Sequence, residues 1–243
     1  MKLTGLLQAL EALPWFQALG NTVNAPHGDS QAYIPDAAKP IVIAGLKERL
    51  QVPTLVLVPR PEDARELWNQ LRLWLGEDYP LHLFPEQDSL PYERLTTDPS
   101  PVYQRLKALA ALLGFSTHSE GAAQKPVSPL VIASVQAASR KILPPARFSS
   151  VVTTLAHGDR IGISQVLQRA TWAGYKREPA VEVPGSISRR GGIIDIYPPH
   201  MESPVRIEFF GDVIESLRLF DPTSQRSISH PSQEGHSVTI TPA

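Results

Sequence analysis

The sequence predicts an α/β fold in two domains: a parallel-sheet domain followed by a smaller α+β domain. Over the first two thirds of the chain, apolar runs typical of buried parallel strands alternate with helical patterns. Such alternation places helices on the faces of a parallel sheet. After Pro144 and Pro145 the pattern changes to short strands and tight turns, which indicate an antiparallel meander. We therefore expect one domain over residues 1–147 and a second over residues 148–243.

The first domain is predicted to contain three strands and five helices. The strands are the apolar runs at 54–59, 81–85 and 130–134. The N-terminus predicts an amphipathic helix, and Asp36 is a candidate cap for a later one. The expected helices cover residues 1–16, 37–50, 61–75, 101–113 and 135–143. Segments 84–101 and 114–129 carry turn residues and are expected to be loops.

The second domain is predicted to begin with a helix capped by Ser164 and ended by Gly174. Gly211 and Asp212 separate two apolar runs and predict a two-residue hairpin turn of type II′ or I′. The expected strands lie within residues 192–199, 205–210, 213–221, 225–229 and 237–242.

Composition excludes several classes of function. The 243 residues are 42% hydrophobic with a formal net charge of −1, which argues against a general nucleic-acid-coating surface. There is no cysteine, so disulfides, thiolate zinc sites and cysteine nucleophiles are excluded. The absence of cysteine fits a reducing cytoplasm, where we expect the protein. No apolar run approaches the roughly 18 residues of a membrane span, so no membrane partner is expected.

The sequence contains no recognisable catalytic or cofactor motif. A phosphate loop would be expected before the helix near residue 40, but Lys39 is followed by Pro40, which has neither a hydroxyl nor an amide proton. No G-x-S-x-G elbow occurs, and the seven histidines are scattered. The tripeptide at residues 157–159, His-Gly-Asp, is more typical of a turn than of a catalytic dyad. We expect no cofactor, no metal and no ATP hydrolysis.

The segment "SRRGGIIDIYPP" concentrates charged residues on a predicted strand. Asp195 is either a catalytic carboxylate or, as we favour, an acid paired with a neighbouring arginine. Gly191 and Gly192 permit a bulge or close backbone approach that redirects Arg189 and Arg190. Strict alternation places Arg189 on the face of Asp195 and Arg190 on the opposite face, unless the glycines form a bulge.

Three motifs in order carry a specific resemblance to a known family. They are "RGGIIDIYP" from Arg190, "RIEFFGD" from Arg206 and "FDPTSQRS" from Phe220. With "PLVIASVQAA" and the segment from Phe84, they resemble the N-terminal region of bacterial transcription-repair coupling factors. That region is itself similar to UvrB, the damage-verification subunit of excision repair. The match runs from about Asp36 to the C-terminus.

The resemblance implies a fold and a partner for each domain. UvrB has an intact phosphate loop, whereas the coupling factors have lost it, so residues 1–147 look like a degenerate P-loop NTPase-type domain. Residues 148–243 look like the second domain, which in this family docks on UvrA. The family's RNA polymerase-binding module and DNA translocase have no counterpart here. The chain therefore resembles an N-terminal fragment without motor activity, which would meet RNA polymerase and DNA only through other domains.

The resemblance also implies a docking patch. Carried over by motif, it contains Arg190 and Tyr197, with Lys176 or Arg177 as a second basic group, and Asp195 shares the strand. This sequence differs in having Arg189 beside Arg190 and two basic residues after Tyr175. Which member of each basic pair faces the partner is left open.

Three hypotheses follow, from different classes of protein. The first is a non-catalytic module that recruits UvrA to stalled transcription complexes in nucleotide excision repair. The second is an ATP-dependent DNA helicase or damage-verification subunit of the UvrB type, which ATP turnover would reveal. The third is direct DNA binding by the arginines, against which the near-neutral charge weighs.

Overall fold

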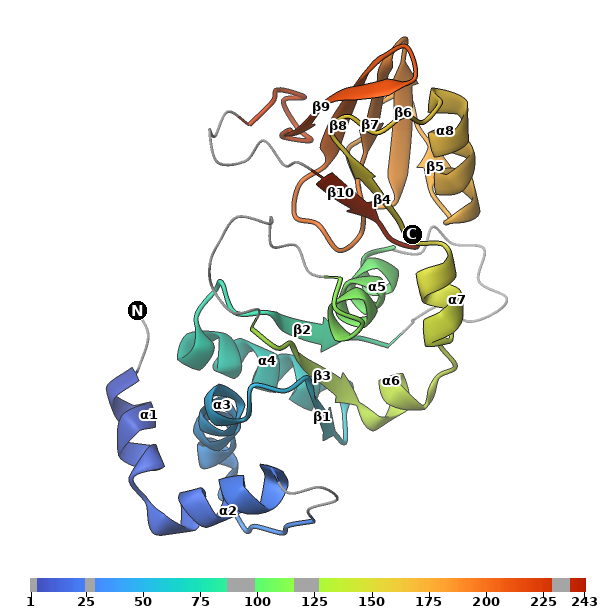
Figure 1. Cartoon of the computed structure of the whole chain (residues 1–243). Coiled ribbons are helices and arrows are strands. Elements are labelled where there is room, and N and C mark those ends of the chain that lie inside the picture. The colour runs from blue at the N-terminus through green and yellow to red at the C-terminus, as the bar shows by residue number, and fades with distance from the viewer. Residues whose placement is uncertain (1–3, 25–28, 87–98, 116–126, 229–236) are drawn as a thin grey trace. The chain divides into compact units, whose positions relative to one another are not determined.

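The computed structural model describes residues 4–24, 29–86, 99–115, 127–228 and 237–243, which form two compact units (Figure 1). The first unit contains the described residues of 1–88 and 125–140, and the second contains those of 89–124 and 141–243. The helix at residues 100–112 thus groups with the second unit. The single domain boundary near residue 147 stays a prediction.

The first unit is built on a parallel sheet. Among the described residues this sheet has three strands in the order β1-β3-β2. The strands are β1 (Thr54–Val58), β2 (Leu81–Phe84) and β3 (Leu130–Ser134). The helices are α1 (Thr4–Glu11), α2 (Pro14–Asn24), the 3-10 helix η1 (Asp36–Ala38), α3 (Lys39–Leu50), α4 (Pro61–Leu75) and α6 (Val135–Ser139).

Helix α4 covers one face of this sheet, and its sequence explains its limits. Pro61 is its first residue, where a missing N–H costs nothing, and Gly76 ends it with a positive φ of 90°. Its apolar residues recur at helical spacing, so Leu67 and Leu71 pack in one core with Leu130 and Ile132 of β3. The predicted parallel strands and the helix over residues 61–75 are confirmed.

Among its described residues, the second unit is built on a five-stranded sheet in the order β5-β6-β7-β8-β9. Strands β6 to β9 form the predicted antiparallel meander, whereas β5 pairs parallel to β6. The strands are β5 (Lys176–Arg177), β6 (Ser186–Arg190), β7 (Ile193–Ile196), β8 (Val205–Phe210) and β9 (Val213–Leu219). The remaining elements are α5 (Ser100–Leu112), α7 (Pro145–Ser150), α8 (Ile163–Trp172) and the paired strands β4 (Thr153–Ala156) and β10 (Ser237–Ile240).

The five-stranded sheet has one apolar and one polar face. Ile187, Ile194 and Ile207 are fully buried, in one core with residues of α8, β4 and β10. Figure 1 shows α8 lying along this sheet. We call this side the α8 face. Because side chains alternate along a strand, the intervening polar residues lie on the opposite side, as is common in antiparallel sheets. We call that side the polar face.

Several predicted element limits differ from the structure. Pro14 interrupts the expected N-terminal helix and begins α2, as proline does at a first helical turn. Asp36 caps no helix: it is the first residue of η1, and its carboxylate pairs with Lys39 at 2.6 Å. Ser164 lies inside α8, whose N-cap is Gly162.

Three further predictions concern the less regular parts of the chain. The helix expected over residues 135–143 ends at Ser139. The strand expected at 225–229 is reduced to one bridge between Phe220 and Ser227. Residues 87–98 and 116–126 of the two predicted loops lie outside the described residues.

Within the described ranges, no helix combines the length and apolar character that crossing a bilayer requires. The same residues hold no group of three or more histidine, aspartate or glutamate side chains that could bind a metal ion.

His200 is a buried histidine in the second unit. It is 3% exposed, and its Nδ1 lies 3.0 Å from the hydroxyl of Thr241 near the end of β10. Burial, with a smaller contribution from the nearby Lys107 ammonium, lowers the pKa of the imidazole to about 4. The side chain is therefore neutral in the folded protein at pH 7.

We expect His200 to make the protein sensitive to acid. Its folded-state pKa lies below the ordinary value of 6.5, so the unfolded chain takes up a proton first as pH falls. The stabilisation is present above pH 6.5 and is lost as pH falls towards 4. Relative to His200→Asn, the native chain should lose roughly 3 kcal/mol of unfolding free energy over that interval. Urea denaturation at several pH values measures this, and parallel curves for the two proteins would contradict the expectation.

Candidate protein-docking site

The turn between β6 and β7 determines which way the two predicted arginines point. Arg190 pairs directly with Ile193, so Gly191 and Gly192 alone form the turn. Gly191 has a φ of 61°, which suits the first central position of a type II′ turn. The two glycines thus form a tight hairpin and not a bulge. The second glycine hairpin, at Gly211 and Asp212, is confirmed by the direct pairing of Phe210 with Val213.

The register places Arg190, not Arg189, on the face of Asp195. Directly opposed residues of an antiparallel pair share a face. Arg190 is opposite Ile193, two residues before Asp195, and Arg189 is opposite the buried Ile194. The expectation from strict alternation was therefore wrong, because alternation does not continue through a two-residue turn.

The short edge strand β5 divides its two basic residues in the same way. Lys176 is beside Ser186 and Arg177 is beside Ile187 in the parallel pairing with β6. Lys176 thus lies on the polar face with Arg190, and Arg177 lies on the α8 face with Arg189. All four side chains are exposed. Among the described residues, none of the four forms an ion pair with a carboxylate.

Asp195 is held by a bidentate ion pair. It is 2% exposed, and its two carboxylate oxygens each accept a hydrogen bond of 2.8 Å from Nε and Nη2 of Arg206 on β8. The Arg206 guanidinium also lies 4.7 Å from the centre of the Phe220 ring. Its hydrogen bonds to Asp195 raise the pKa of Arg206. The favoured interpretation of Asp195, an acid paired with a neighbouring arginine, is confirmed.

A second, more exposed cluster lies farther along the polar face. Glu208 accepts a hydrogen bond of 2.7 Å from the hydroxyl of Ser216, and Arg218 approaches the same carboxylate at 3.5 Å. The side chains of Arg218 and Glu208 are 45% and 30% exposed, compared with 18% and 3% for Arg206 and Asp195. Water screens the outer pair far more than the inner one.

Tyr197 is buried below the polar face. It is 9% exposed and packs with Val181 and Phe220. Its hydroxyl donates a hydrogen bond of 2.7 Å to the carbonyl of Glu202. Burial, with a smaller contribution from Glu202, raises the pKa of this hydroxyl, so it stays protonated and keeps its donor role.

Arg190 is exposed but anchored. Its Nη2 donates a hydrogen bond of 3.3 Å to the carbonyl of Pro179, which also accepts a 3.1 Å bond from the hydroxyl of Ser188. A guanidinium has five N–H donors, so this contact orients the group and leaves most of its donors for a partner.

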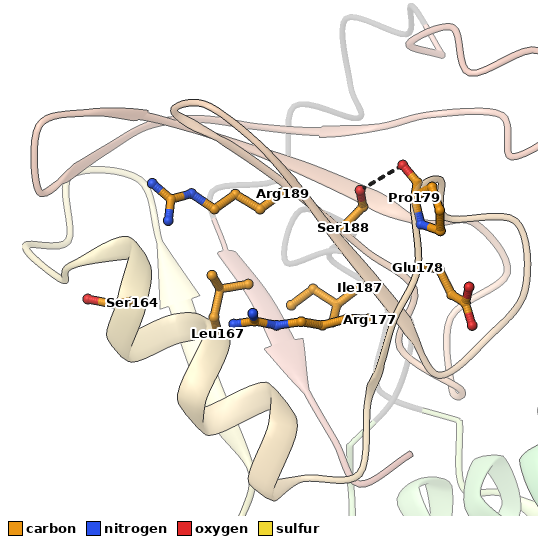
Figure 2. Close-up of a pocket in the computed structure, with 8 residues that line it drawn as sticks. All are labelled: Ser164, Leu167, Arg177, Glu178, Pro179, Ile187, Ser188 and Arg189. Atoms are coloured by element: carbon orange, nitrogen blue, oxygen red, sulfur yellow. Dashed lines mark hydrogen bonds between the residues drawn. The ribbon is translucent and has the colours of Figure 1, made fainter.

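The other two arginines line a pocket on the α8 face (Figure 2). The pocket has a volume of about 390 Å³ and lies between α8 and the β5–β6 edge. Figure 2 shows Arg177 and Arg189 extending in the same direction, towards the side where α8 lies. The structure thus separates the predicted site residues: Lys176 and Arg190 on one face, Arg177 and Arg189 on the other, with Asp195 and Tyr197 mainly buried.

The residues just before and at the start of α3, where a phosphate loop would be expected, make local contacts. The ammonium of Lys39 is paired with Asp36, and Pro40 is the second residue of α3. The first turn of α3 has no side-chain cap. The Lys39 ammonium is thus engaged by a carboxylate.

We expect the loss of one partner of the Asp195–Arg206 pair to destabilise the fold strongly. Asp195→Ala leaves a largely buried guanidinium without its carboxylate, which should cost about 3 kcal/mol of unfolding free energy. Glu208→Ala breaks the more exposed pair on the same face and should cost less than about 1 kcal/mol. Equal losses for the two variants in chemical denaturation would refute this ranking.

Comparison with known proteins relates the chain to one family. Residues 153–243 match the family model described as the UvrB interaction domain. The chain is 34% identical over 197 residues to the transcription-repair-coupling factor of Myxococcus xanthus, covering 79% of this chain and 16% of that protein. It is 32% identical over 213 residues to that of Bacillus subtilis (strain 168), covering 87% and 17%.

A third relative extends the match to nearly the whole chain. The transcription-repair-coupling factor of Mycobacterium tuberculosis (strain CDC 1551 / Oshkosh) is 31% identical over 226 residues, covering 93% of this chain and 18% of that protein. The chain therefore spans about a sixth of the length of these relatives. The motifs, the fold and these matches together show that the chain belongs to the transcription-repair-coupling factor family.

Proposed function

We propose that this chain is a non-catalytic docking module that binds UvrA and so brings nucleotide excision repair to stalled transcription complexes. The observation that carries the proposal is the placement of Lys176 and Arg190. Both are exposed on the polar face at the β5–β6 edge, and no described carboxylate pairs with either. Cations without a carboxylate partner at a sheet edge are suited to contact acidic groups on another protein.

The buried residues of the predicted patch support this surface from below. Asp195 fixes Arg206, and Tyr197 packs under Phe220, on whose ring the Arg206 guanidinium lies. We assign to Asp195 and Tyr197 the positioning of the sheet and to Lys176 and Arg190 the contact with UvrA. A preorganised contact surface reduces the entropy that binding must overcome.

We further propose that the first unit is a P-loop-type domain that has lost nucleotide hydrolysis. Its parallel sheet supports that origin, and Lys39 and Pro40 account for the loss. In this account RNA polymerase and DNA are contacted by the parts of the family proteins that this chain does not span, and the site of action is the cytoplasm. No feature of the described residues favours the UvrB-type helicase or direct DNA binding.

The docking proposal predicts that Lys176→Gln combined with Arg190→Gln weakens UvrA binding by at least about 30-fold. Each true hot spot is worth roughly 2 kcal/mol, and glutamine keeps a similar length while removing the charge. Isothermal titration of UvrA with the full chain measures the affinity. Since both side chains are exposed, the melting temperature of the variant should stay near that of the native chain.

Arg169→Gln is the matched control, because Arg169 is an exposed arginine of α8 that lines neither surface. It should bind UvrA as the native chain does. If the double variant keeps native affinity, or if Arg169→Gln loses as much, the assignment to the polar face is wrong.

The lost phosphate loop predicts that the chain does not hydrolyse ATP. Pro40 offers no amide proton or hydroxyl for phosphate or magnesium, and Lys39 is paired. A phosphate-release assay with and without duplex DNA should show the background rate. ATP turnover that copurifies with the chain and is lost in Lys39→Ala would support the UvrB-type enzyme instead.

A further inference from the structure

Arg177 and Arg189 form a site separate from the proposed contact surface. The register places them on the α8 face, across the sheet from Lys176 and Arg190. They are not neighbours in sequence, yet both line the pocket of about 390 Å³ beside α8. The sheet pairing of β5 with β6 is what brings the two guanidinium groups to one pocket.

The lining of this pocket is suited to an oxyanion. Figure 2 shows the two guanidinium groups extending in the same direction beyond Ile187, while the carboxylate of Glu178 points away from them. The Nε of Arg189 donates a hydrogen bond of 3.1 Å to the carbonyl of Gly191, which orients the group and leaves its terminal nitrogens available. Leu167 also lines the pocket and adds an apolar side chain to it.

Neither guanidinium is neutralised within the part of the chain that the structure describes. No ion pair joins Arg177 or Arg189 to a carboxylate there. Arg206, in contrast, is paired with Asp195 at 2.8 Å on the polar face. Two cations that line one pocket without a counter-charge repel each other, so an anion that enters the pocket relieves the repulsion. A single guanidinium can bind a carboxylate or phosphate group in a bidentate manner.

We propose that this pocket receives the carboxylate of an acidic side chain from the docked partner protein. The partner would then contact both faces of the β5–β6 edge. The inference rests on the proposed function. Strand β5 has only two residues and is the edge of the sheet, so Lys176 on one face and Arg177 on the other are adjacent. A protein that contacts this narrow edge can reach both.

The charge balance favours a carboxylate from a protein over a DNA phosphate. Residues 148–243 contain nine lysines and arginines and ten acids, so the domain offers no broad cationic field for a polyanion. Two arginines in one pocket match a single acidic side chain, which needs a local and directed site.

The test compares two double variants of the full chain in titrations with UvrA. Arg177→Gln with Arg189→Gln alters the pocket, and Lys176→Gln with Arg190→Gln alters the polar face. We expect the pocket variant to weaken UvrA binding by about 10-fold or more, with Arg169→Gln unchanged. Arg177→Lys with Arg189→Lys should recover only part of the affinity, because lysine keeps the charge but not the bidentate geometry.

Each outcome decides between the two ideas. If only the polar-face variant weakens binding, the pocket proposal is overturned and the proposed function stands. If UvrA does not bind the native chain at all, the proposed function fails and the pocket proposal with it. If the pocket variant keeps UvrA affinity but loses retention of a labelled duplex at low salt, the pocket binds DNA and the proposal is wrong. Thermal melting confirms that each variant is folded.

Discussion

The direct pairing of Arg190 with Ile193 across Gly191 and Gly192 decides the direction of the charged side chains along this hairpin. From that pairing, the register continues through Asp195 opposite Arg206 and Arg206 opposite Arg218. A shift by one residue would move Asp195 into the apolar core and place Ile194 against Arg206 on the polar face, so the register is strongly specified. The basic residues at the sheet edge therefore occupy fixed faces.

The Asp195–Arg206 ion pair forms only in this register, and it lies on the same face as the proposed contact residues. A bidentate pair that is almost buried tolerates neither a slip of the strands nor the loss of one partner. Phe220 lies against the Arg206 guanidinium and packs with Tyr197, which supports the polar face. On the same face Arg190 donates a hydrogen bond to the carbonyl of Pro179. In this account the buried charges provide stability and orientation, while the exposed ones at the β5–β6 edge provide recognition.

The parts of the fold that sequence could predict depend on local signals. Helix α4, the three parallel strands and the Gly211–Asp212 turn follow from periodicity and turn residues. The orientation of Arg189 and Arg190 was missed, since it depends on whether two glycines form a hairpin or a bulge. Arg206 was not singled out as the partner of Asp195 because the β7–β8 register is non-local; the alternation in "VRIEFF" was the available signal. Pro14 began a helix where continuation was expected, and Gly162 capped α8 where Ser164 was expected.

The most direct test of the central claim is a structure of this chain bound to UvrA, determined at a resolution that shows side chains. The account predicts that the β5–β6 edge is buried in the interface, with Arg190 within hydrogen-bond distance of a UvrA carboxylate and the Asp195–Arg206 pair intact beneath it. An interface centred elsewhere, with Lys176 and Arg190 still exposed to solvent, would contradict it.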